Sequence, residues 1–277
     1  MVVVDLTKSQ GISYARVALG LLPRRRGTGL PDREVVRHAA AVDREHLARY
    51  DRVCGFRLTD ALPATYPHVL AAPLAMRLMS AADFPFPLAG LVHVANRITV
   101  RRPVDAGSRL DLSVRAADLR PHHRGQQFDV VISAAVDGEE VWHGVSTYLR
   151  KVGQGGRGDQ GDQPPGPAAA LWRVPARVGP DYAAVSGDHN PIHTSRLGAR
   201  LFGFPRPIAH GMWSMARCLA ALEGRLPAAY TVDVAFKLPI LLPAMVGFAA
   251  ARAAGGWDFT VRSAGSGRPH LAGSITG

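Results

Sequence analysis

Apolar and polar residues alternate along several stretches of the chain with the period expected for half-buried β-strands. An apolar stretch of helical length precedes each group of these stretches, at 73–82 in the first half and at 211–222 in the second, where Gly224 is a natural helix end. Asp137-Gly138 joins two of the stretches and predicts a tight hairpin. One buried helix followed by an antiparallel meander predicts an α+β fold, in which each half wraps a sheet around a central helix. The predicted strands cover residues 91–100, 109–116, 127–136 and 140–150, then 231–238, 245–254 and 257–262.

The two halves of the chain repeat each other. Tyr50-x-x-Val53-Cys54-Gly55 is echoed 132 positions later by Tyr182-x-x-Val185-Ser186-Gly187, and further along the offset is a constant 140. An ordered series of matches at one offset indicates a duplicated unit. The change of offset predicts about eight extra residues in the second half, near 197–204. The later matches are Pro67 with Pro207, Arg77 with Arg217, residues 92–95 with 232–235, Arg97 with Lys237, and Pro103 with Pro243.

A tract rich in Gly, Gln, Asp and Pro separates the halves. It carries too few apolar side chains to offset the entropy of ordering it, so we expect a flexible linker. The predicted organisation is an N-terminal domain at 1–151, a linker at 152–168 and a C-terminal domain at 169–277.

The composition is that of an ordinary globular protein, with 47% hydrophobic and 20% charged residues among 277. No apolar run reaches the length of about 18 residues that a membrane span needs. The start of the chain does not resemble a secretory signal. The two cysteines, Cys54 and Cys218, are isolated, which favours a reduced cytoplasmic protein over a disulfide framework.

The net charge is +11 and comes almost entirely from arginine. Such a surface suits nucleic acid, but no nucleic-acid motif accompanies it. A phosphorylated small ligand or an acidic carrier protein suits it as well. A coding bias that favours arginine over lysine explains the charge without any partner.

Residues 182–193 carry the strongest chemical signal in the chain. Asp188 and His193 stand five residues apart across a turn predicted from Gly187 and Asn190-Pro191. A carboxylate and an imidazole held that close can share one water, take a proton and return it. Each residue alone also suits a turn, a cap or a hydrogen-bonded loop. Ser186 lacks the elbow sequence of a nucleophilic serine, so the joint pattern favours acid–base chemistry.

The segment Gly187-Asp188-His189-Asn190-Pro191-Ile192-His193, with Ala199 and Ala209-His210-Gly211-Met212 further on, resembles the hydratase 2 motif of the MaoC-like dehydratases. That family has the hotdog fold. The first half, through Thr65-Tyr66-Pro67 and residues 83–86, is similar to the degenerate N-terminal hotdog of its two-domain members. The resemblance therefore implies a tandem double hotdog that reversibly hydrates a trans-2-enoyl thioester to the (3R)-hydroxyacyl thioester.

The resemblance places the catalytic pair at Asp188 and His193. The reaction also needs a group that holds the oxygen on which negative charge develops. Gly211 is the candidate, because it would begin the buried helix, where free N–H groups and the helix dipole favour an anion. Four further residues are expected to shape the site: Ser186, Asn190, Pro191 and His210.

The first half lacks the catalytic pair. Phe56 stands in the place of Asp188, no histidine falls where His193 would, and Asp60 is a turn residue without an imidazole partner. We expect this half to be non-catalytic and to line a wider acyl tunnel with residues 70–86. The offset of 140 also sets Ala71 against Gly211 and Leu70 against His210.

Some alternatives stay open at this point. An idle acyl-thioester binding module, a scaffold subunit and a hotdog thioesterase would suit the same fold. No cofactor fingerprint and no metal-ligand spacing is present, so neither group is expected. Arg24, Arg25 and Arg26 are candidates to meet the phosphates of CoA or an acidic acyl carrier protein. The sequence does not decide between these carriers, the chain length, the direction, or a monomer with an internal pseudo-dimer and a homodimer.

Overall fold

The structure is a computed structural model that describes residues 2–6, 27–88, 90–151 and 168–277. Arg24, Arg25, Arg26 and all but the last residue of the predicted linker lie outside these ranges. The elements of the first half are β1 (Val2–Asp5), β2 (Arg33–Ala41), α2 (Arg44–Cys54), α3 (Tyr66–Met79), β3 (Leu91–Val100), β4 (Arg109–His122), β5 (Gly125–Val136) and β6 (Glu139–Lys151).

The second half repeats this plan. Its elements are β7 (Ala170–Val174), α4 (Val178–Ser186), α5 (Pro191–Thr194), α6 (Arg196–Leu201), α7 (Gly211–Ala221), β8 (Tyr230–Phe236), β9 (Ala244–Ala253), β10 (Gly256–Ser263) and β11 (Pro269–Thr276).

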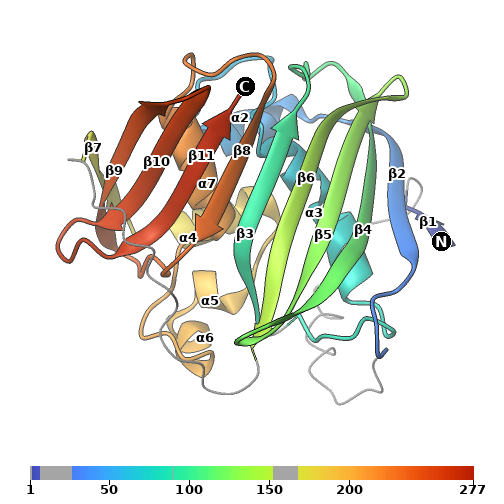
Figure 1. Ribbon diagram of the computed structural model, residues 1–277, viewed down its shortest axis with the longest axis horizontal. Helices are drawn as coiled ribbons and strands as arrows, with labels where there is room; N and C mark the ends of the chain where they lie inside the picture. The colour runs from blue at the N-terminus through green and yellow to red at the C-terminus, as the bar shows by residue number, and fades with distance from the viewer. Residues whose placement is uncertain (1, 7–26, 89, 152–167) are drawn as a thin grey trace.

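The described strands form one 11-stranded sheet in the order β1-β2-β4-β5-β6-β3-β8-β11-β10-β9-β7. All neighbours run antiparallel except β1 and β2. Helices α2, α3, α4 and α7 lie against one face of the sheet (Figure 1). Each half therefore wraps an antiparallel meander around a central helix, α3 or α7, and the predicted α+β layout is confirmed.

The two halves meet where β3 pairs with β8. Ala95 faces Ala235 directly, and these residues are 140 positions apart, the offset of the sequence repeat. Two antiparallel strands related by a two-fold axis bring equivalent residues together at that axis. Tyr50 and Tyr182, the first residues of the repeated motif, also lie close together. Helix α2 packs on α4, and the two rings are 6.2 Å apart. The pairing supports an internal duplication.

The central helices are anchored by apolar side chains. Leu74 and Leu78 of α3 and Met215 and Leu219 of α7 are at most 1% exposed. Full burial of each such side chain contributes about 1.5–3 kcal/mol. The buried side chains of α7 hold this helix, which begins at Gly211, against the sheet. No helix in the described ranges is long and apolar enough to cross a membrane.

The hairpin prediction is confirmed, while the helix limits need correction. Asp137 and Gly138 both have positive φ, 52° and 82°, as a tight turn between β5 and β6 requires. Helix α3 begins at Tyr66 rather than 73 and accommodates Pro73. Helix α7 ends at Ala221 with Leu222 as its C-cap, so Gly224 belongs to the turn that follows.

The structure also bears on the sequence repeat and on the predicted strands. Helix α3 begins five residues before Ala71, so the offset of 140 sets a residue inside α3 against Gly211, the first residue of α7. The extra residues of the second half include α6. Strands β1, β2, β7 and β11 were not among the predicted strands. In β11 only Leu271 and Ile275 are buried, and Gly273 lies between them on the same face of the strand.

Candidate active site

The loop between α4 and α5 is built from local hydrogen bonds. Helix α4 ends at Gly187, whose φ of 73° is the left-handed conformation that glycine adopts without strain. The Ser186 hydroxyl then accepts the Asp188 N–H at 3.2 Å, and Asp188 Oδ1 accepts the Asn190 N–H at 3.1 Å. Asn190 caps α5 by accepting the Ile192 N–H, with Pro191 in the first turn. Ser186, Asn190 and Pro191 thus hold the loop that presents the carboxylate.

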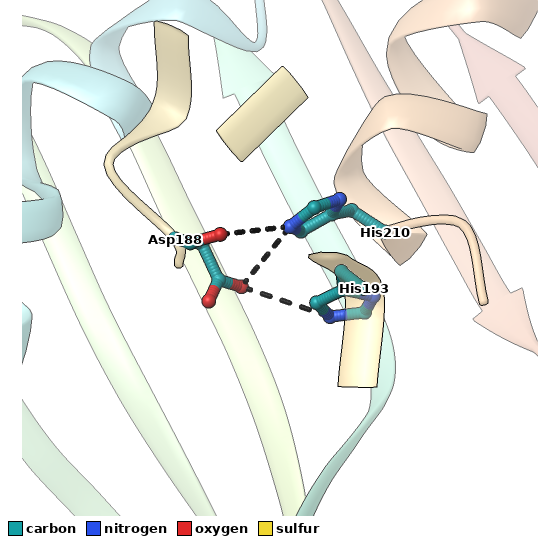
Figure 2. A group of neighbouring side chains, drawn as sticks. All are labelled: Asp188, His193 and His210. Carbon is teal, nitrogen blue, oxygen red and sulfur yellow. Dashed lines mark hydrogen bonds and ion pairs between the residues drawn. The ribbon is translucent and has the colours of Figure 1, made fainter. Parts of the chain in front are cut away.

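The structure brings Asp188 and His193 together (Figure 2). His193 Nδ1 lies 2.8 Å from the carbonyl oxygen of Ile208. Because a carbonyl only accepts, Nδ1 carries the proton and Nε2 carries the lone pair. Nε2 faces Asp188 Oδ2 at 3.9 Å, too far for a direct hydrogen bond. Two proton acceptors across such a gap can both receive hydrogens from one water.

His210 connects this loop to α7. Its Nε2 donates to the main-chain carbonyl of Asp188 at 3.0 Å and lies 3.8 Å from the carboxylate. Its ring stacks on His193 with centroids 3.6 Å apart, and the Tyr182 ring lies 4.9 Å away on another side. His210 Nδ1 is buried without a partner in the described chain. These contacts position the carboxylate and the His193 ring relative to the helix start.

The electrostatics favour one carboxylate beside two neutral imidazoles. Burial opposes ionisation of Asp188, but His210, His193 and the Asn190 N–H bring its pKa below the usual value. Burial lowers the pKa of His193, and Asp188 and the Ile208 carbonyl offset this only in part. Burial, followed by His193, lowers the pKa of His210 to about 4. At neutral pH the site therefore holds one negative charge and an open lone pair on His193.

Gly211 begins α7 directly after His210 and faces the same cavity. The first N–H groups of a helix have no partner inside it and attract negative charge. A Cβ at this position would lie 3.2 Å from the ring of Phe236, so glycine lets that ring pack against the helix start. Phe236 is a site neighbour that the sequence did not indicate, since it looked like any apolar strand residue.

A cavity of about 1880 Å³ lies in front of the pair, above the usual 300–1,000 Å³ of small-molecule pockets. About half of the Asp188 side chain is exposed to it. Leu70, Met76 and Met79, from the stretch expected to line an acyl tunnel, face this cavity. The end of that stretch does not, because Phe84 and Phe86 pack in the core against Phe128.

Among the described residues of the first half, no matching carboxylate–imidazole pair follows α2. Phe56 follows Gly55 and stacks on Tyr50 at 6.4 Å. Asp60 is exposed and pairs with Arg44. The cavity wall of this half instead presents polar rings that no motif had indicated, His68, His93 and Tyr148.

The three site side chains also have a spacing that a metal ion could use. Asp188, His193 and His210 each offer one ligand atom, and these atoms lie within 4.8 Å of one another. The sequence had indicated no metal site. In the described chain, however, His210 Nε2 already donates to a carbonyl and its Nδ1 is buried, an arrangement that suits a positioning residue better than a metal ligand.

A sheet wrapped around two central helices, with a carboxylate–imidazole pair before the second, defines a double-hotdog protein. A family model described as MaoC like domain matches residues 176–253. The 3-hydroxyacyl-thioester dehydratase X of Mycobacterium tuberculosis is 40% identical over 280 aligned positions, which cover 98% of this chain and 100% of that protein. The chain belongs to the MaoC-like dehydratase family.

Solved structures agree with this assignment. The crystal structure of HtdX of Mycobacterium tuberculosis superposes with a TM-score of 0.80 at 40% identity and covers 88% of this chain and 100% of its own. A MaoC-like dehydratase from Phytophthora capsici superposes with a TM-score of 0.71 over 88% of this chain and 94% of its own. Its identity of 19% means that it supports the fold alone.

Proposed function

We propose that the protein reversibly hydrates a trans-2-enoyl thioester to the (3R)-hydroxyacyl thioester, with Asp188 and His193 as catalytic pair. The observation that carries this proposal is the pair of proton acceptors, Asp188 Oδ2 and His193 Nε2, that face each other at 3.9 Å in a large cavity. The relative named 3-hydroxyacyl-thioester dehydratase X adds support from sequence.

The proposed chemistry uses one water. Ionised Asp188 and neutral His193 both accept hydrogens from it, and one of them takes a proton as the water oxygen attacks C3. A proton is returned to C2, so that the elements of water are added across the double bond. Negative charge that develops on the thioester oxygen is stabilised by the N–H of Gly211 at the start of α7. Dehydration is the reverse sequence.

We further propose that the first half, residues 1–151, is non-catalytic and widens the cavity for the acyl chain. Its α2 is followed by Phe56 instead of a carboxylate, while Leu70 and Met76 face the cavity. The site is thereby complete within one chain, and we propose a monomer with an internal pseudo-dimer. Both cysteines are free and buried, which supports a reducing compartment, the cytoplasm. Light scattering on a size-exclusion column gives the mass that tests the monomer.

The substrate carrier is CoA or an acyl carrier protein. The proposed phosphate contacts Arg24, Arg25 and Arg26 lie outside the described residues, but Lys237 and Arg268 are exposed and border the cavity. Either carrier would bring phosphate to such residues, and its binding would weaken with salt. Arg268→Ala should raise KM at low salt and reduce its salt dependence, while Arg49→Ala, whose side chain does not line the cavity, should not. Equal salt dependence in all three proteins would contradict these contacts.

The activity is tested with crotonyl-CoA and a longer enoyl-CoA. A hydratase removes the ultraviolet absorbance of the conjugated double bond without releasing thiol. A thioesterase releases thiol, which a thiol reagent detects, and a binding module does neither. Asp188→Asn and His193→Ala should each lower kcat by about 10²–10⁴-fold, whereas Asp60→Asn should turn over like the wild type. Wild-type rates in either site variant would refute the catalytic pair.

A further inference from the structure

Three aromatic side chains with polar atoms line the cavity on the side of the first half. His68 comes from α3, His93 from β3 and Tyr148 from β6, and α3 lies behind these strands (Figure 1). The His93 ring stacks on Tyr148 at 4.9 Å and is nearly parallel to His68 at 6.4 Å. This group, the polar ring cluster, uses three elements that are separate in sequence and lies outside the motif that carries the catalytic pair.

Most polar atoms of the polar ring cluster have no hydrogen-bonding partner among the described residues. The His93 ring bonds to the backbone at Ala95, but its Nε2 is buried without a partner in the described chain. Within residues 27–88, 90–151 and 168–277, neither the His68 ring nor the Tyr148 hydroxyl forms a hydrogen bond or an ion pair, and both face the cavity. Polar groups inside a protein are normally paired, and a polar ligand atom in the cavity would supply the missing partner.

The cluster is also uncharged. Burial lowers the pKa of His68 to about 4 and that of His93 to about 3, although the Asp188 carboxylate acts in the opposite direction on both. A neutral imidazole offers one donor and one acceptor, and a phenol offers both. These groups match a hydroxyl, which donates and accepts, better than a phosphate or a carboxylate, which requires positive charge.

The position of the cluster relates it to the acyl chain. The Phe236 ring packs against Gly211 on one side and lies edge-on to His93 at 5.0 Å on the other. The cluster therefore lies one ring beyond the proposed oxyanion donor. The cavity wall of the first half also includes apolar side chains, Leu70, Met76, Met79, Val130 and Ile132. An aliphatic chain that passes this wall would meet the cluster after leaving the reacting carbons.

We infer that His68 and Tyr148, backed by the stacked ring of His93, form a subsite for a hydroxyl group on the acyl chain of the substrate, beyond C3. The inference rests on the proposed function and names its substrate class: acyl thioesters with a second oxygen along the chain. A plain chain would leave the cluster facing methylene groups, so such substrates should be hydrated less efficiently.

The test compares trans-2-dodecenoyl-CoA with analogues that carry one hydroxyl at each position from C5 to C9. One hydrogen bond gained is worth about 1–1.5 kcal/mol, so the best analogue should exceed the plain substrate about tenfold in kcat/KM. Tyr148→Phe keeps the stacked ring and removes only the hydroxyl, and His68→Leu removes the imidazole. Both should bring the ratio close to one. His143→Leu, also on β6 but outside the cavity wall, should retain the wild-type ratio.

Three results would overturn the inference. Equal kcat/KM for plain and hydroxylated substrates in the wild type would remove its basis, while leaving the proposed function standing. An equal loss on both substrates in Tyr148→Phe and His68→Leu would assign the cluster to the reacting centre or the thioester arm. Absence of hydration with every substrate would contradict the proposed function and, with it, the subsite.

Discussion

Replacement of Gly211 by alanine is the smallest change that reaches the proposed oxyanion donor. The added Cβ would lie 3.2 Å from two atoms of the Phe236 ring and 3.3 Å from a third. Carbon atoms are comfortable at about 3.5–4.0 Å, so the ring or the helix start must move by a few tenths of an ångström. Alanine suits a helix better than glycine by up to about 1 kcal/mol. Stability should therefore hold while the geometry of the site changes.

The expected result is a fall in kcat of about tenfold, below the 10²–10³-fold that loss of an oxyanion donor costs, because the N–H remains but is displaced. Steady-state hydration of an enoyl-CoA measures kcat and KM, and thermal unfolding reports stability. Phe236→Leu removes the ring atoms that the new methyl group meets, so the double variant should recover most of the lost rate. Gly265→Ala is the matched control, since a Cβ there meets nothing within 4 Å.

Two outcomes would refute the reasoning. Wild-type kcat in Gly211→Ala would mean that the start of α7 does not hold the thioester oxygen. A rate loss in Gly211→Ala that Phe236→Leu leaves unchanged would mean that the clash is not its cause.

Three more predictions follow from the structure. The pKa values of both Asp188 and His193 are lowered. The kcat/KM for hydration should therefore stay level from neutral pH to below about 6.5, the ordinary pKa of histidine, and fall only when either group is protonated. A pH–rate profile in which kcat/KM already falls above about pH 6.5 would contradict this prediction. Burial and Glu223 raise the pKa of Asp51 to about 7, so the folded state binds this proton more tightly than the unfolded state and loses stability as pH rises towards and through 7. Asp51→Asn should then unfold at higher urea than the wild type at pH 8, by about 1–3 kcal/mol, but not at pH 4. In Gly179→Ala the new Cβ would collide with the main-chain carbonyl of His193, and stability should fall by about 1–3 kcal/mol together with kcat, as denaturant unfolding and the hydration assay would show.

Local signals in the sequence predicted a large part of the fold. Asp137-Gly138 requires two positive φ angles, which few other dipeptides accept, and the structure has both. The alternation along β5 and β6 reflects one face on the core and one outside it. The β11 strand was not predicted because it is held by pairing with β8 and β10. Small residues such as Gly273 give no alternation of apolar and polar side chains that would indicate such pairing.

The candidate site also has a part that the sequence could predict and a part that it could not. The loop from Gly187 to His193 was predictable because its turn, cap and chemistry lie within one short segment. Phe236 and the polar ring cluster were not, because α3, β3, β6 and β8 bring them to the cavity from distant positions. The start of α3 at Tyr66 was not predictable either, because Thr65 makes no side-chain cap hydrogen bond that would mark it.

The catalytic pair is tested most directly by a comparison of Asp188→Asn, His193→Ala and the double variant with the wild type. If both groups act on one water, they form a unit, and their losses do not multiply. We predict that each single variant loses about 10²–10⁴-fold in kcat and that the double variant is no slower than the slower single variant by more than a small factor. Wild-type turnover in either single variant, or a double variant whose loss is the product of the two, would contradict the account.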